Sequence, residues 1–173
     1  MTETLLEARS VRRTFGGGRS LFGTRQPAVE AVRHVDLDLE RGETLGLVGE
    51  SGCGKSTFAR MVAGLDTPSA GRIRLDGEDV SALARHDMRA LARRIQYVFQ
   101  DAQSALNPRK TIRRILEAPM IHLLHLGRDE RARRLESLME AVNLEPEHLE
   151  RYPHEFSGGQ AQRIGIARAL AAE

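Results

Sequence analysis

The stretch that decides the fold is Gly49-Glu50-Ser51-Gly52-Cys53-Gly54-Lys55-Ser56-Thr57. It matches the pattern G-x-x-x-x-G-K-[ST], in which successive backbone N–H groups turn inward around a phosphate. A helix that begins here adds the partial positive charge of its N-terminus. The nonapeptide therefore predicts a phosphate-binding loop.

The segments on either side of the loop support this interpretation. Thr44-Leu45-Gly46-Leu47-Val48 is continuously apolar, as expected of a strand that is covered on both faces. After the loop, apolar side chains recur at helical spacing; they are Phe58, Met61, Val62 and Leu65. Strand, glycine loop and helix follow one another, which predicts an α/β protein of the P-loop NTPase class.

The loop residues have distinct expected roles. The Lys55 ammonium is expected to reach the β- and γ-phosphates of ATP, and the Ser56 hydroxyl to ligate Mg²⁺. Thr57 is expected to hydrogen-bond a nearer phosphate, whereas Cys53 contributes its backbone and needs no thiol chemistry. ATP and Mg²⁺ are thus the expected ligands.

Residue patterns typical of β-strands lie before and after the strand, glycine loop and helix described above. Leu5 to Val11 is β-compatible, and Gly16 to Pro27 interrupts the pattern as a long hairpin loop. From His34 to Glu40 apolar and acidic residues alternate, which indicates a strand with one buried face. Ile95 to Phe99 is expected to return to the core as a further strand, so we expect a mixed sheet with an antiparallel part.

Beyond Pro108 the character changes, because amphipathic helical patterns follow one another without intervening strands. We expect one domain with a nucleotide-binding α/β core over about 1–100 and an inserted helical subdomain over about 101–155. Residues 156–173 form a last segment that has helical spacing again.

Composition excludes several other classes. The chain has 173 residues, 40% hydrophobic residues, 4% aromatic residues and a net charge of +2, which does not fit a nucleic-acid-binding protein. Arginines and acids are mixed between Arg128 and Glu136, as on an ion-paired helix surface. The single cysteine favours a cytoplasmic setting, and no apolar run approaches the roughly 20 residues of a membrane span.

A second short segment, Phe156-Ser157-Gly158-Gly159-Gln160, precedes the last helical pattern. Alone it could be a plain helix N-cap or an anion site. Together with the phosphate loop, however, Ser157-Gly158-Gly159-Gln160 resembles the signature sequence of ATP-binding-cassette (ABC) ATPases. The resemblance extends from about Leu5 to Glu173.

This resemblance implies further roles. Gln100 matches the Q-loop glutamine, which contacts Mg²⁺ and the attacking water; by itself it would be read as a polar strand end. Phe15 stands at the place of the aromatic residue that stacks on adenine, although hairpin packing remains the alternative. Two cassettes pair head to tail in this family, so Ser157 to Gln160 would contact the ATP of a partner subunit.

The sequence also resembles one subgroup of the ABC ATPases. The segments Val98–Asp101, Ser104–Arg109 and Arg151–Gln160 resemble the ATP-binding subunits of oligopeptide, dipeptide and nickel importers. Membership implies permease partners and a place at the cytoplasmic face of the membrane. Ala102 and Ala161 depart from the pattern of the group, which usually has proline at the first position and a polar or basic residue at the second.

In this family the strand with the Mg²⁺-binding aspartate and the catalytic glutamate, the D-loop and the switch histidine would all follow Glu173. Leu45, Leu47 and Val48 are therefore expected to be incompletely covered in this chain. The alternatives are a nucleotide-binding module without hydrolysis, a soluble ABC ATPase without a membrane partner and, least favoured, a small P-loop kinase.

Overall fold

The computed structural model describes residues 3–17 and 27–173, in two compact units, Met1–Leu91 and Ala92–Glu173, each considered by itself. The first unit contains β1 (Thr4–Phe15), β2 (Val29–Glu40), α1 (Lys55–Val62), β3 (Ala70–Leu75), β4 (Glu78–Asp79) and α2 (Val80–His86). Helix α3 (Met88–Arg94) runs across the boundary between the units. Most of the expected hairpin loop after Gly17 lies outside the described residues.

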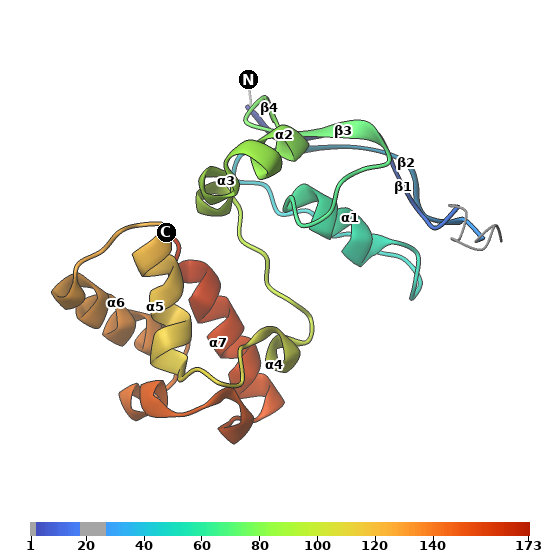
Figure 1. Ribbon diagram of the computed structural model, residues 1–173. Helices are drawn as coiled ribbons and strands as arrows, with labels where there is room; N and C mark the ends of the chain where they lie inside the picture. Colours follow the sequence, from blue (N-terminus) through green and yellow to red (C-terminus); the bar gives the residue numbers. More distant parts are fainter. Residues whose placement is uncertain (1–2, 18–26) are drawn as a thin grey trace, which may run out of the picture. The chain divides into compact units, whose positions relative to one another are not determined.

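The first unit is built on a four-stranded sheet in the order β2-β1-β3-β4, with antiparallel pairing throughout (Figure 1). The alternation expected after His34 is confirmed, because Val35, Leu37 and Leu39 are half-buried and the acids between them are exposed. On β1 the alternation shifts after Ala8, where Ser10 has a φ of 50° at a register shift. This bulge returns Val11 to the buried face.

Two expected strands are not formed. The segments 44–48 and 95–99 have no strand pairing among the described residues, so the expectation of two further strands is wrong for this chain. A strand exists only where a neighbour satisfies its backbone groups, and a β-compatible sequence does not supply that neighbour. The expected exposure is confirmed: Leu45 and Leu47 are each 44% exposed, and Val48 is 94% exposed.

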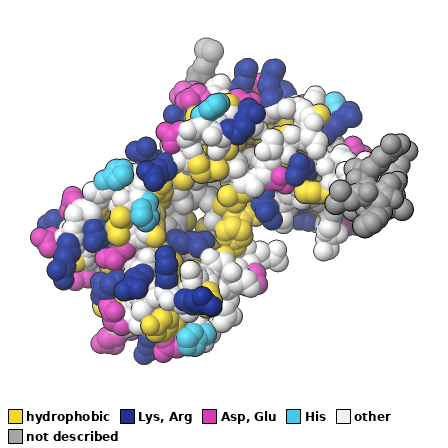
Figure 2. All heavy atoms as spheres, viewed as in Figure 1, with side chains coloured by type: hydrophobic (Ala, Val, Ile, Leu, Met, Phe, Trp, Pro, Cys, Tyr) yellow, Lys and Arg dark blue, Asp and Glu magenta, His cyan; other side chains and the backbone are white. Residues whose placement is uncertain are grey.

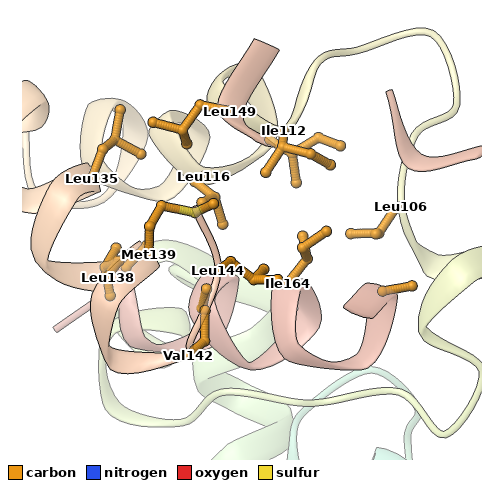
Figure 3. Packing of buried hydrophobic residues seen from close by; sticks show 14 of the residues in the cluster. Leu106, Ile112, Leu116, Leu135, Leu138, Met139, Val142, Leu144, Leu149 and Ile164 are labelled. Atoms are coloured by element: carbon orange, nitrogen blue, oxygen red, sulfur yellow. The ribbon is translucent and has the colours of Figure 1, made fainter. Parts of the chain in front are cut away.

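The second unit is helical. It contains α4 (Ala102–Ala105), α5 (Ile112–His122), α6 (Arg128–Ala141), the short 3₁₀ turns η1 (Pro146–Glu150) and η2 (Pro153–Glu155), and α7 (Gly158–Leu170). The apolar faces expected from the sequence meet in one core, in which Leu116, Met139 and Ile164 are fully buried (Figure 3). These side chains come from α5, α6 and α7, so the last helix packs in the same core as the two before it.

The surface carries both signs of charge. Basic and acidic side chains lie next to one another over the region of α6, as the mixed sequence of that helix predicted (Figure 2). In residues 3–17 and 27–173, every helix is too short or too polar to cross a bilayer.

Candidate nucleotide-binding site

Three glycines give the phosphate loop its shape. Gly49, Gly52 and Gly54 have φ angles of 155°, 81° and 97°, values that side-chain-bearing residues rarely adopt. The Gly54 carbonyl accepts the first hydrogen bond of α1, from the Phe58 N–H at 2.8 Å. The loop therefore ends directly at a helix N-terminus, as the sequence predicted.

Gly54 is also required by its surroundings. A Cβ atom at this position would lie 2.1 Å from the carbonyl oxygen of Ala31, which belongs to β2. The end of the loop thus rests directly on the backbone of a strand that precedes it by more than twenty residues. Motif reasoning missed this contact, because nothing in the sequence of β2 marks Ala31 as the support.

The Lys55 side chain folds back over the loop. Its ammonium donates hydrogen bonds to the carbonyl oxygens of Gly49 and Glu50, each at 2.7 Å, and lies 3.5 Å from the Cys53 sulfur. The first turn of α1 contains no acidic residue and has no side-chain cap. The Lys55 ammonium and a helix N-terminus without a side-chain cap therefore lie at the same end of α1, and both favour an anion there.

A cavity of about 450 Å³ adjoins the loop on the side of β2. Its walls include residues 30–33 and 35 of β2, residues 47 and 48, residues 52–55 and Phe58. Ser56, Thr57 and Phe15 are not among the lining residues. The cavity thus borders the loop from Gly52 to Lys55 and does not extend to Ser56 and Thr57 in the first turn of α1.

Phe15 is the last residue of β1 and pairs with Val29 of β2. The residue is 43% exposed, and the guanidinium of Arg13 lies over its ring, 4.5 Å from the centroid. A partly exposed ring in the same unit as the loop is compatible with base stacking. Arg13 was not identified from the sequence, although its position two residues before Phe15 on a strand places both on one face.

Gln100 belongs to the second unit, where it is exposed at the bend before α4. The carbonyl of its neighbour Phe99 accepts a hydrogen bond at 3.5 Å from Gln162, which lies on α7. Arg168 of α7 donates to the Ala105 carbonyl at 2.9 Å, and burial lowers the pKa of Arg168. The segment that carries Gln100 is thus tied to α7 at two points that sequence reasoning did not find.

Helices α4 and α7 pack closely because their facing residues are small. A Cβ atom at Gly165 would lie 3.6 Å from the Cβ of Ala102. Ala161 is fully buried, and Ala102 is 5% exposed. Both departures from the family pattern are therefore interior positions of the second unit.

Asp101, the residue after Gln100, caps α4. The Ser104 hydroxyl and backbone N–H donate to its carboxylate at 2.5 and 3.1 Å, and these hydrogen bonds hold the pKa of Asp101 below its usual value. A carboxyl with a lowered folded-state pKa stabilises the fold above its unfolded pKa, and this stabilisation is lost as pH falls through the folded pKa. We expect Ser104→Ala to raise the pKa of Asp101 in a carboxyl NMR titration. An unchanged pKa would contradict this account of the cap.

The second glycine segment also opens a helix. The Ser157 Oγ accepts the Gln160 N–H at 3.3 Å, and the Gln160 side-chain oxygen accepts the Ser157 N–H at 3.1 Å, which is a capping box. Gly158 and Gly159 follow as exposed residues of α7, and a Cβ atom at either would meet nothing within 4 Å of the described chain. Their φ angles are not in the left-handed region. The packing of this chain gives no reason for two glycines there.

The predicted site residues are divided between the two units. The phosphate loop and Phe15 lie within Met1–Leu91, whereas Gln100 and residues 157–160 lie within Ala92–Glu173. Within each unit the predicted residues stand at exposed or half-buried positions. An α/β unit whose glycine loop opens a helix, joined to a helical unit with a glycine-rich cap, defines a P-loop nucleotide-binding protein.

The particular family follows from comparison with known proteins. The family model described as ABC transporter matches residues 32–173, and the chain belongs to this family. The solved dimeric, post-hydrolysis structure of the ATP-binding cassette MJ0796, bound to ADP and Pi, has 29% identity and a TM-score of 0.85, covering 97% of this chain and 70% of that one. The P-loop α/β fold class expected from the sequence is thereby confirmed.

Curated relatives carry the names expected for the subgroup. The oligopeptide transport ATP-binding protein AppF of Bacillus subtilis (strain 168) is 49% identical, over 97% of this chain and 51% of its own length. The di/tripeptide transport ATP-binding protein DppF of Pseudomonas aeruginosa (strain UCBPP-PA14) is 44% identical over 97% and 52%. The nickel import ATP-binding protein NikE of Escherichia coli (strain K12) is 46% identical over 88% and 57%. The chain spans about half the length of the relatives it matches.

Proposed function

We propose that this chain binds ATP with Mg²⁺ at its phosphate loop and forms part of an ATP-binding subunit that powers the import of peptides or nickel. The observation that carries ATP binding is the Lys55 ammonium at the mouth of the loop, 2.7 Å from two loop carbonyls and next to the uncapped N-terminus of α1. The two carbonyl oxygens hold the Lys55 ammonium, and an anionic phosphate can compete with them for it.

The residues of the loop fit a nucleoside triphosphate. The backbone N–H groups from Gly52 to Thr57 would surround the phosphates, and Lys55 would pair with the outer ones. The left-handed glycines let the backbone curl without side chains in the path of a ligand. Phe15 would stack on the base.

Bound Mg²⁺ would neutralise phosphate charge. We assign the Ser56 hydroxyl and the Gln100 side chain as its protein ligands. Ser56 is exposed in the first turn of α1, next to Lys55, which supports this role because its hydroxyl is free to reach a bound ion. Among the described residues, no group of three His, Cys, Asp or Glu side chains is placed to hold a metal ion. The phosphates and water would supply the remaining ligands.

Import of peptides or nickel is supported by the names of the relatives, which are transport and import ATP-binding proteins. The motifs Val98–Asp101 and Ser104–Arg109 point to the same subgroup. Such a subunit would work in the cytoplasm at the inner face of the membrane, bound to permease subunits. The ATP-driven motion would pass to the permease through the segment around Gln100, which is tied to α7.

A second ABC subunit would complete the site. Ser157 to Gln160 would contact the ATP held by the phosphate loop of that partner, and the partner would return the same contact. The two exposed glycines of α7 support this arrangement, because the chain's own packing leaves open space around them. The related ATP-binding cassette that was solved with ADP and Pi is dimeric.

Replacing Gly158 with alanine tests the contact with the ATP of the partner subunit without destabilising the fold. A Cβ atom fits without a clash, and alanine favours a helix by up to about 1 kcal/mol relative to glycine, so stability in urea is expected to stay equal or rise. ATP-dependent dimerisation, measured by light scattering after size exclusion, is expected to be lost.

The matched control is Gly127→Ala, a glycine at the start of α6 that has no proposed partner. Gly127→Ala should leave ATP-dependent dimerisation intact. Dimerisation of Gly158→Ala with the affinity of the unmodified protein would contradict the proposed signature contact. ATP turnover measured on the same samples distinguishes hydrolysis from binding alone.

A further inference from the structure

We propose that Arg13 is a positioning residue that holds the Phe15 ring in place for a purine base, with Asp66 as its anchor. This inference rests on the proposed function, in which Phe15 stacks on the base of ATP. The guanidinium carbon of Arg13 lies 4.5 Å from the ring centroid of Phe15, within the range of a cation–π contact. Both residues are on β1, two positions apart, and therefore share one face of the strand.

Asp66 fixes the guanidinium. A terminal nitrogen of Arg13 lies 2.7 Å from Asp66 Oδ1, and the two side chains are only 23% and 18% exposed. The same carboxylate oxygen accepts the Thr67 N–H at 2.8 Å, which holds Asp66 in turn. An ion pair with this degree of burial is less screened by solvent than a surface pair.

Asp66 also links Phe15, where the base would stack, to the helix that begins at the phosphate loop. Asp66 follows α1, and its N–H donates to the Arg60 carbonyl at 3.3 Å near the end of that helix. Further along, Ser69 contacts two residues of β1: its N–H donates to the Arg12 carbonyl at 2.8 Å, and its hydroxyl accepts the Thr14 N–H at 3.1 Å and donates to the Thr14 carbonyl at 3.4 Å. Helix α1 thus begins at the phosphate loop, and the segment that follows it carries Asp66 and Ser69, which contact β1.

The burial of Arg13 has a cost that hairpin packing alone does not explain. Its Nε is buried without a hydrogen-bond partner in the described structure. Phe15, by contrast, stays 43% exposed as a residue, so the contact does not bury it. A cation held over the ring, 4.5 Å from its centroid, restricts the motion of the ring and covers one of its faces, so a base would stack on the other face.

The test compares two ligands, ATP and inorganic tripolyphosphate, which has the phosphates without the base. In Arg13→Gln the affinity for ATP is expected to fall about fivefold, because the ring loses its cation and its anchor. The affinity for tripolyphosphate is expected to stay unchanged. Arg13→Lys retains a cation near Asp66 and is expected to restore most of the ATP affinity.

Arg12→Gln is the matched control, since Arg12 is the exposed neighbour on β1 and faces His34 at 3.3 Å. It should leave both affinities unchanged. Once Phe15→Ala has been made, adding Arg13→Gln should cause no further loss, because the two residues act as one unit.

Four results would overturn the inference. Equal weakening of ATP and tripolyphosphate by Arg13→Gln would show a purely structural role, and an unchanged ATP affinity would show no role. An unmodified chain that binds tripolyphosphate as tightly as ATP would remove the base subsite while leaving the phosphate loop intact. Binding of neither ligand by the unmodified, folded chain would overturn the proposed function and this inference with it.

Discussion

Replacing Lys55 with methionine is expected to weaken ATP binding about 100-fold, because about 3 kcal/mol of charge-assisted hydrogen bonding to the phosphates is lost. The ammonium is the one side-chain cation that the structure places over the loop carbonyls of Gly49 and Glu50 within the described residues. Methionine has a similar length and no charge, so the loop keeps its shape. Equilibrium binding of a fluorescent ATP analogue measures the change.

Lys110→Met is the control for this prediction. Lys110 is an exposed residue of the second unit and lies outside the phosphate-loop motif. The same change of residue type should leave ATP binding within twofold of the unmodified protein, as expected of a surface substitution. Equal ATP affinities of Lys55→Met and Lys110→Met would contradict the assignment of Lys55 to the phosphates.

Replacing Gly54 with alanine is expected to lower the free energy of unfolding by about 3 kcal/mol and to abolish ATP binding. Alanine at a φ of 97° costs about 1–3 kcal/mol of backbone strain. The new Cβ would also lie 2.1 Å from the Ala31 carbonyl oxygen, which forces the loop away from β2. Urea denaturation followed by circular dichroism measures the stability.

The variant Gly52→Ala separates the cost of backbone strain from the cost of a steric clash. Gly52 has a φ of 81°, but a Cβ atom there would meet nothing within 4 Å. This variant should lose only the strain term, about 1–2 kcal/mol. If the two variants lose equal stability, the contact with Ala31 does not support the loop.

The sequence predicted those features of the fold that depend on short local residue patterns. The glycine loop, the helix that follows it and the alternation from Val35 to Leu39 lie where periodicity and motif placed them. The apolar faces of α5 and α6 were also predicted correctly and meet in the core of the second unit. Each of these features is encoded within fewer than fifteen consecutive residues.

The expectations that failed, and the contacts that were missed, depend on residues that are distant in the sequence. Residues 44–48 and 95–99 have β-compatible sequences, yet a strand also needs a neighbour at hydrogen-bonding distance. The contact of Arg13 with Asp66 joins positions more than fifty residues apart, and so does the contact of Phe99 with Gln162. Such pairs follow from the tertiary fold and leave no periodic signal in one sequence. The roles of Gln100 and of residues 157–160 in ATP binding remain predictions.

ATP binding by the phosphate loop underlies the other roles that we propose for this chain. Isothermal titration of the chain with ATP and Mg²⁺ measures this binding, with folding checked by circular dichroism. We predict saturable binding at one site per chain in the unmodified protein and about 100-fold weaker binding in Lys55→Met. Absence of saturable binding to the folded, unmodified chain, or equal binding by both proteins, would contradict the claim.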